Sequence, residues 1–283
     1  DDLSWMLELT APSIKASMNA RHRELGLSRE IISKSNAVIE KALREGEHLP
    51  REELVARLNQ AGIATDENRA SHLFACAELD GIICSGKLIH GKQTYALLEN
   101  RAARSKPLPK ETALGMLAHQ YFTSRAPATL KDFAWWSGLS SRAASTAFEV
   151  IRGNFISETI AGNVYWFPND TVAPHSSEAE QVYLLPAFDE FIIAYADRGA
   201  VLPAGIGKKA ISENGVFRPV VVLDGQVIGI WKRRIKKEQV SIEIELFQPI
   251  QTETKSLIED AARQYGQFLE KEAELVWVNH GIH

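Results

Sequence analysis

Apolar residues recur at helical spacing in the first hundred residues of the chain. Between residues 28 and 43 they return every three or four positions, and Ser28 is placed to cap the helix that this pattern predicts. Residues 50–62 predict a second, shorter helix, and residues 68–79 predict a third. Two β-like runs around a glycine-containing loop then span residues 82–98. Three helices followed by a hairpin is the order of a winged helix.

The same order returns roughly 75 residues further along the chain. Helices are expected at 112–123, 129–139 and 140–151, and the run FISETIAGNVYWF at 155–167 predicts a second hairpin. The third helix of each set has the same apolar spacing. The same order of three helices and a hairpin is much less expected to occur twice by chance than once. The pattern therefore predicts tandem winged helix-turn-helix units.

The remainder of the chain has a different pattern. Short strands are expected at 182–185, 240–246 and 274–278, and the pair Asp224-Gly225 indicates a tight hairpin turn. A helix is expected at 252–269. The predicted fold class is therefore α+β, with tandem winged helix-turn-helix units followed by a C-terminal β-rich α+β domain.

These patterns divide the chain into four segments. Stretches rich in proline, asparagine and serine at 106–109 and 168–180 are the expected linkers. The segments are a remnant of another unit or a linker at 1–27, winged helices at 28–100 and 110–168, and the β-rich domain at 182–283.

Composition narrows the class of protein. The net charge of −4 excludes a generally cationic nucleic-acid binder, so any such contact must come from local basic patches. Two cysteines and scattered histidines predict no disulfide framework, metal site or cofactor. No stretch has the length and apolarity of a membrane span, and the first residues do not resemble a signal peptide. We expect a protein of the reducing cytoplasm, without membrane partners.

Five strings, in this order, carry a resemblance to a known family: GLSREIISKSNAVIEKAL, LPREELVARL, ATLKDFAWWSGL, LLPAFDEFIIAYADR and VVVLDGQVIGIWKRR. Together they resemble the AlkZ-like, or YcaQ-like, DNA glycosylases, over residues 26–247. The resemblance implies tandem winged helices, a β-rich domain, and hydrolysis of the N-glycosidic bond of alkylated or crosslinked bases in double-stranded DNA.

The family's catalytic signature is a Gln-x-Gln or Gln-x-Asp pair, and none of the 283 residues forms one. Either the chain begins inside a longer protein that carries the pair, as its start without Met suggests, or this member only binds DNA. No catalytic residue is assigned. Asp189 is the one alternative within the chain that we would test, because a glycosylase needs a group that positions water. An Asp and an Arg in such a setting, here Asp189 and Arg198, more often form a structural pair, and that interpretation is favoured.

Candidate DNA contacts come from the third helix of each repeat, the first hairpin and a basic run between two C-terminal strands. The basic run KRRIKK is expected to project five cations from one loop. The candidates are Asn68, Arg69, Ser71, His72, Lys87, Lys92, Ser141, Arg142, Ser145, Thr146, Arg198, Lys232, Arg233, Arg234, Lys236 and Lys237.

Each candidate also has an ordinary structural explanation. The third helices can bind proteins or nothing, and the basic run can be a solvated loop that protects sheet edges. Trp136 is expected in the core beside Phe133, which leaves Trp135 as the exposed tryptophan available for base stacking. A non-catalytic transcriptional regulator and a protein-binding scaffold therefore stay open beside the glycosylase-related function.

Overall fold

The structure, a computed structural model, describes residues 2–102, 108–171 and 180–278. It divides into two compact units, Asp1–Ala126 with Ser137–Ile156 and Pro127–Trp136 with Ser157–His283. Much of the two predicted linkers, residues 106–107 and 172–179, lies outside the described residues.

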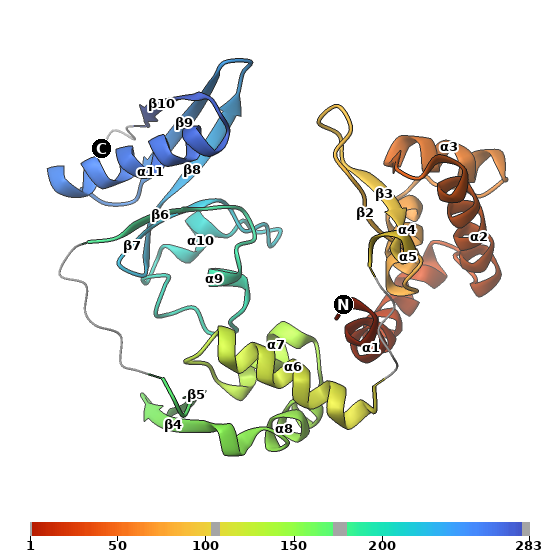
Figure 1. Cartoon of the computed structure of the whole chain (residues 1–283), viewed down its shortest axis with the longest axis horizontal. Helices are drawn as coiled ribbons and strands as arrows, with labels where there is room; N and C mark the ends of the chain where they lie inside the picture. Colours follow the sequence, from red (N-terminus) through yellow and green to blue (C-terminus); the bar gives the residue numbers. More distant parts are fainter. Residues whose placement is uncertain (1, 103–107, 172–179, 279–283) are drawn as a thin grey trace. The chain divides into compact units, whose positions relative to one another are not determined.

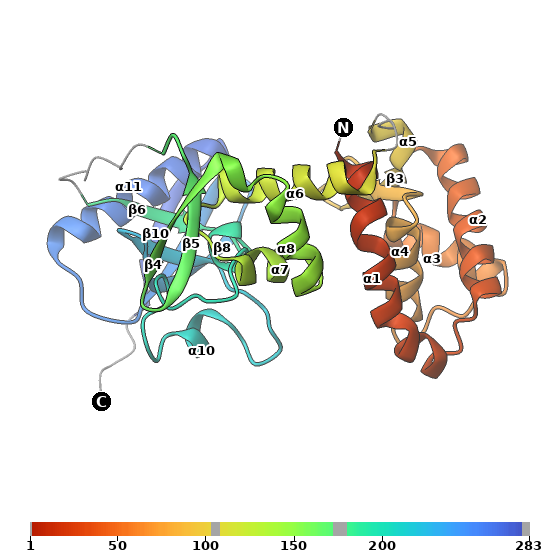
Figure 2. The same cartoon turned by 90° about the horizontal axis from the view of Figure 1, so that it is seen from below.

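The first unit begins with a helix where a linker or remnant was expected. Helix α1 (Leu3–Glu24) has 22 residues and buries Trp5, Ala11 and His22. It packs alongside α4, as Figure 2 shows. The apolar residues of α1 do not form one continuous face, because some are buried and others are exposed. The sequence pattern alone therefore did not reveal this helix. Most of the segment 1–27, where a remnant of another unit or a linker was expected, is therefore a helix.

The first predicted set of helices and strands is present. Ser28 caps α2 by accepting a hydrogen bond from the backbone N–H of Ile31. Side chains of α2, α3 and α4, among them Leu43, Leu54 and Phe74, form a closed core. The elements are α2 (Arg29–Gly46), β1 (Leu49–Pro50), α3 (Arg51–Gln60), α4 (Arg69–Leu79), β2 (Ile83–Ser85), β3 (Thr94–Leu97) and α5 (Leu98–Arg101).

A small antiparallel sheet of order β1-β3-β2 completes this set, and its hairpin projects past the helices in Figure 1. Strand β1, which directly precedes α3, was not predicted. Two residues that include a proline give no recognisable alternation, and the strand exists only through its pairing with β3.

The second predicted set has the same order. Just before α7, Ala128 bridges Trp166 of the second hairpin strand, as β1 pairs with β3 just before α3. Helices α6 and α8 belong to the first compact unit, whereas α7 and residues 157–168 of the hairpin belong to the second. The elements are α6 (Lys110–Ser124), α7 (Leu130–Ser137), α8 (Ser141–Glu149), the 3₁₀ turn η1 (Arg152–Asn154), β4 (Phe155–Ile160) and β5 (Asn163–Pro168).

The second unit contains a five-stranded sheet of order β10-β9-β8-β7-β6. All neighbours are antiparallel except β9 and β10, which are joined by the crossover helix α11. Asp224 and Gly225 form the β7–β8 turn with positive φ angles of 46° and 81°. The strands are β6 (Val182–Leu185), β7 (Val220–Leu223), β8 (Gln226–Ile235), β9 (Gln239–Leu246) and β10 (Glu272–Trp277).

Different elements cover the two faces of this sheet (Figure 1). Helix α11 (Thr252–Phe268) packs through Ile258 and Ala262 on one face. The short helices α9 (Glu190–Ile193) and α10 (Gly207–Ala210) contribute Ile192 and Ala210 to a second cluster that includes Ile230 of β8. The mixed fold with a C-terminal sheet agrees with the predicted α+β class.

Candidate nucleic-acid interface

Helix α8 presents its predicted polar face to solvent. Ser140 caps the helix by accepting from the backbone N–H of Ala143. Ala144, Ala147 and Phe148 are buried on the opposite side. Four predicted contacts are exposed together at the start of the helix: Ser141, Arg142, Ser145 and Thr146.

This face borders a shallow groove of about 560 Å³ whose lining includes the cations Lys110 and Arg142, the carboxylate Glu111 and the hydroxyl of Thr146. Within the described part of the chain, no ion pair occupies the guanidinium of Arg142. Small hydroxyl side chains beside it allow a phosphate to approach the free backbone N–H groups of the first helical turn. The arrangement is suited to holding a phosphodiester.

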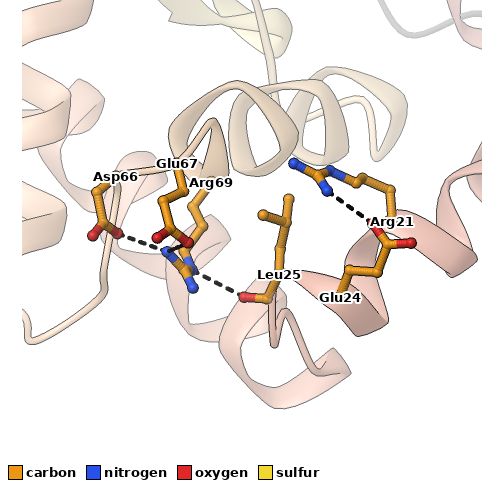
Figure 3. Close-up of polar contacts among 6 residues, drawn as sticks. All are labelled: Arg21, Glu24, Leu25, Asp66, Glu67 and Arg69. Atoms are coloured by element: carbon orange, nitrogen blue, oxygen red, sulfur yellow. Dashed lines mark hydrogen bonds and ion pairs between the residues drawn. The ribbon is translucent and has the colours of Figure 1, made fainter.

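Helix α4 has a different polar face, because Arg69 is bound within the protein (Figure 3). Its Nε donates to the carbonyl of Leu25 at 2.9 Å, and its Nη1 lies 2.8 Å from Asp66 and 3.0 Å from Glu67. Only 22% of its side chain is exposed. Arg69 joins the end of α1 to the start of α4, which gives it a structural role that the sequence did not indicate.

His72 does not point outward as predicted. Its ring packs edge-on against the buried ring of His22, with 5.1 Å between ring centres. Its Nδ1 is enclosed and has no hydrogen-bond partner among the described residues. Burial, together with the nearby His72, lowers the pKa of His22 below its ordinary value. His72 is therefore part of the α1–α4 contact, and the prediction of an outward side chain is wrong.

The other two candidates on α4 are exposed. Asn68 adopts the left-handed conformation at the helix start and makes no capping bond with its side chain. The hydroxyl of Ser71 accepts a hydrogen bond from Arg51. Since Arg69 and His72 are occupied, α8 is the better candidate for a groove-facing helix.

The two lysines of the first hairpin are both exposed. Lys87 lies at the base of its tip, and Lys92 pairs with Ile89 across it. They project from β2 and β3 independently of α4.

The basic run 232–237 is not a loop, which corrects the prediction. Lys232, Arg233 and Arg234 belong to β8, and only Lys236 and Lys237 lie in the turn to β9. Because successive strand residues face opposite sides, these cations cannot all project together. The loop prediction failed because residues 232–237 are mostly charged and lack the apolar alternation by which a strand is recognised in sequence. The alternation is found in β9, the strand with which they pair.

The two faces of this strand end therefore differ. Arg233 lies on the α11 side, where it donates to the hydroxyl of Tyr265 at 2.6 Å. Lys232 and Arg234 share the side of Ile230, the side covered further along by α10. Lys232 lies opposite Glu243 in the register of β8 and β9.

Three exposed cations near α10 were not singled out from the sequence. Lys208 and Lys209 lie on α10, and Arg218 precedes β7. Lys209 stands 5.1 Å above the ring of Phe247, a member of the same cluster as Ile230. The adjacent lysines at 208 and 209 could have indicated this basic patch in the sequence. That they lie on the same side of the sheet as Lys232 follows only from the fold.

Arg198 is partly buried in the second unit, where it contacts two aromatic rings and a backbone carbonyl. Its guanidinium carbon lies 5.2 Å from the ring centres of both Trp135 and Phe217, and its Nε donates to the carbonyl of Ile192. Its Nη2 is enclosed and has no hydrogen-bond partner among the described residues. Burial lowers the pKa of Arg198. These contacts favour a structural role for Arg198, and its contact with DNA stays a prediction.

Asp189 is also committed to the fold. Its carboxylate caps α9 by accepting from the backbone N–H of Phe191 at 2.9 Å. A more deeply buried carboxylate, which the sequence did not reveal, is Asp132. One of its oxygens accepts from Thr129, and the other accepts from the backbone N–H of Ala196. Both carboxylates therefore hold backbone in place.

The two tryptophans of α7 follow the prediction in part. Phe133 is fully buried, and Trp135 is 55% exposed although its Nε1 donates to the carbonyl of Ile193. Trp136 is half-buried and donates to Glu190 at 3.0 Å, so it is less enclosed than a core residue.

Two further classes of site are not seen in the described residues. No group of three or more His, Cys, Asp or Glu side chains there is arranged to hold a metal ion. None of the helices in residues 2–102, 108–171 and 180–278 combines the length and apolarity needed to cross a bilayer.

Comparison with known proteins agrees with the fold. Over residues 1–268 the sequence matches the family described as DNA glycosylase AlkZ-like. The interstrand DNA cross-link repair glycosylase of Streptomyces sahachiroi is 26% identical over 206 residues, which cover 66% of this chain and 54% of that protein. This chain thus spans about half the length of that relative.

The solved structure of the Streptomyces sahachiroi DNA glycosylase AlkZ is similar with a TM-score of 0.73. The match has 19% sequence identity and covers 98% of this chain and 77% of the other, which shows a shared fold. Because the family match extends over nearly all of its residues, this chain belongs to the AlkZ-like DNA glycosylase family.

Proposed function

We propose that this chain supplies the DNA-binding part of a DNA repair glycosylase and recognises duplexes with alkylated or crosslinked bases. The observation that carries this proposal is the family match over residues 1–268. The relative from Streptomyces sahachiroi is named for repair of interstrand DNA cross-links, which suggests the class of lesion.

The exposed face of α8 supports a direct contact with the duplex. The order of helices and hairpin in both repeats is that of a winged helix, in which the third helix enters the major groove with its N-terminal residues toward the bases. Ser141, Arg142 and Ser145 are exposed at that end of α8. We assign α8 the leading contact and α4 a supporting one, because Arg69 of α4 is already bound to two carboxylates.

A second contact is assigned to the basic end of the β8–β9 hairpin. Lys232 and Arg234 lie on one strand face, and Lys236 and Lys237 lie in the adjoining turn. Each phosphate that a cation neutralises releases counterions, so this surface adds affinity without reading bases. In a chain of negative net charge, such a local concentration of cations is what a polyanion requires.

Binding of a fluorescently labelled duplex, measured by anisotropy over a range of salt concentrations, tests the proposal. We expect affinity to fall steeply with salt and to be higher for duplex containing 7-methylguanine or a crosslink than for intact duplex. Arg142→Ala should reduce the salt slope by about 0.9 if the guanidinium contacts one phosphate. Arg69→Ala is the matched control and should leave that slope unchanged.

Other outcomes would favour the alternatives. Equal affinity for damaged and intact duplexes, with a preference for one sequence, would indicate a transcriptional regulator. Affinity that does not respond to salt would remove the DNA-binding proposal and leave a scaffold for protein partners.

A further inference from the structure

The tip of the β2–β3 hairpin displays apolar side chains to solvent. Leu88 is 70% exposed and Ile89 is 40% exposed. Neither contributes to the core of the first repeat, which closes around Leu73, Phe74 and their neighbours without them. A leucine this exposed is costly in water, and in a hairpin that projects from the helices it is available to a partner (Figure 1).

The tip is held rigidly. Ile89 and Lys92 exchange both backbone hydrogen bonds, at 3.0 and 2.9 Å. Between them, His90 and Gly91 have positive φ angles of 51° and 75°, as in the tight turns that suit a twisted hairpin. Leu88 directly precedes this turn, so its backbone position is defined.

The base of the tip is braced as well. The backbone N–H of Lys87 donates to Nδ1 of His48, and its carbonyl accepts from the hydroxyl of Thr94 at 2.6 Å. A Cβ atom on Gly86 would lie 2.4 Å from that hydroxyl and 2.7 Å from the same nitrogen of His48. The glycine is thus required for this close approach.

The charge around the tip indicates what it meets. Lys87 and Lys92 flank the apolar pair and are exposed, and no aspartate or glutamate occurs between residues 81 and 98. The second hairpin also exposes apolar residues, including Ile156 and Ile160, but residues 155–168 contain no lysine or arginine. Of these two hairpins, the first alone combines an apolar tip with cations complementary to phosphate.

We propose that Leu88 is a wedge that enters the minor groove and opens a base step, while Lys87 and Lys92 contact nearby phosphates. Proteins that bend DNA insert leucine, isoleucine or phenylalanine between base pairs from the minor groove, and the insertion kinks the duplex. The inference rests on the proposed binding of duplex DNA. It adds a shape-distorting contact that the groove-facing helix does not supply.

Energy transfer between dyes at the two ends of a short duplex tests this wedge with the full chain. Binding of the unmodified protein should bring the ends closer, because a wedge kinks the duplex by about 20–90°. Leu88→Ser should abolish most of this change and weaken binding about tenfold, as expected when one leucine side chain is no longer buried. The salt slope should stay the same, because no phosphate contact is removed.

Two further variants make the test specific. The double variant Lys87→Ser, Lys92→Ser should flatten the salt slope. Phe268→Ser is the matched control, because Phe268 is 81% exposed at the end of α11 and should affect neither bending nor affinity. Circular dichroism spectra of all variants establish that they are folded.

The outcomes separate this inference from the proposed function. Salt-dependent binding with equal bending by the unmodified protein and Leu88→Ser would overturn the wedge and leave the DNA-binding proposal in place. Absence of duplex binding by the unmodified protein would overturn both. Binding to anionic lipid vesicles that Leu88→Ser abolishes, without any effect on DNA, would assign the tip to a membrane surface and also overturn the wedge.

Discussion

Arg198 shows how a single residue connects separate parts of the second unit. It stacks between Trp135 of α7 and Phe217 of the segment before β7, and it binds the carbonyl of Ile192 in α9. A cation enclosed by two rings contributes more than an exposed one, because water screens less of its interaction. These contacts give Arg198 a structural role, so we expect its removal to act on stability.

We expect Arg198→Ala to lower the free energy of unfolding of the second unit by about 2 kcal/mol, because it removes two cation–ring interactions and one hydrogen bond. Urea denaturation followed by tryptophan fluorescence measures this change. Arg218→Ala, at an exposed arginine nearby, is the control and should change it by less than about 0.5 kcal/mol. Similar values for both variants would show that the stacked arrangement contributes nothing.

His22 makes the stability of the first unit depend on pH. Its pKa is lowered by burial first and by His72 second, from an ordinary value of 6.5. In the unfolded chain His22 takes up a proton as the pH falls through that value, whereas in the folded protein it stays neutral to lower pH. Because the unfolded state then binds more protons, the free energy of unfolding decreases as the pH falls below 6.5 toward the folded pKa.

Denaturation of the unmodified chain at pH 7.5 and pH 5 should show this loss of stability in acid. The variant His22→Gln removes the titrating group, and its unfolding free energy should vary less between the two pH values. His72→Gln removes only the second cause and should have a smaller effect. If His22→Gln has the same pH dependence as the unmodified chain, the buried histidine is not its source.

Strand β8 shows, at the level of an element, how pairing overrides local pattern. Its last residues are mostly cations, yet they continue the sheet because Val240, Ile242 and Ile244 of the paired β9 are buried beneath α11. The strand therefore distributes these cations over its two opposite faces, whereas a loop would not fix their directions. Arg233 is exposed as well but is bound to Tyr265, so the other face and the turn are the surface that we propose for a polyanion.

We therefore expect the replacement of Lys232, Arg234, Lys236 and Lys237 by Ser to weaken binding to all duplexes alike. Removal of each cation that neutralises a phosphate should flatten the salt slope by about 0.9. Arg233→Ser is the internal control, because that side chain is bound to Tyr265 and should affect stability more than the slope. An unchanged slope in the fourfold variant would leave these residues as solubilising charge.

For the whole molecule, binding and hydrolysis are separable activities. The resemblance implies a Gln-x-Gln or Gln-x-Asp pair for catalysis, and no such string occurs in these 283 residues, while Asp189 caps a helix. Cleavage of an N-glycosidic bond needs a group within hydrogen-bond reach of the attacking water or of the developing sugar cation.

We predict that these 283 residues bind duplex containing 7-methylguanine without releasing the base. Chromatography of free base over time measures release, with Asp189→Asn as the comparison, since asparagine also caps helices. Robust release that disappears in Asp189→Asn would place the active site in the C-terminal unit and refute the prediction.

Helices and strands with a clear period were predictable to within a few residues. The cap at Ser28, the turn at Asp224-Gly225 and the strand at 182–185 all appear where the sequence placed them. Helix α1 and strand β1 were missed, because one has a weak apolar face and the other is defined only by its partner.

Periodicity, capping residues and turn pairs act over a few neighbouring positions, so they suffice to place the elements and their order. They also suffice to indicate which face of α8 meets solvent. Which polar residues are available for binding depends on partners distant in the chain. Arg69 is bound to Leu25, His72 faces His22, and Arg198 stacks on Trp135. Such contacts exist only once the chain has packed, because close packing and the pairing of buried charge are tertiary effects.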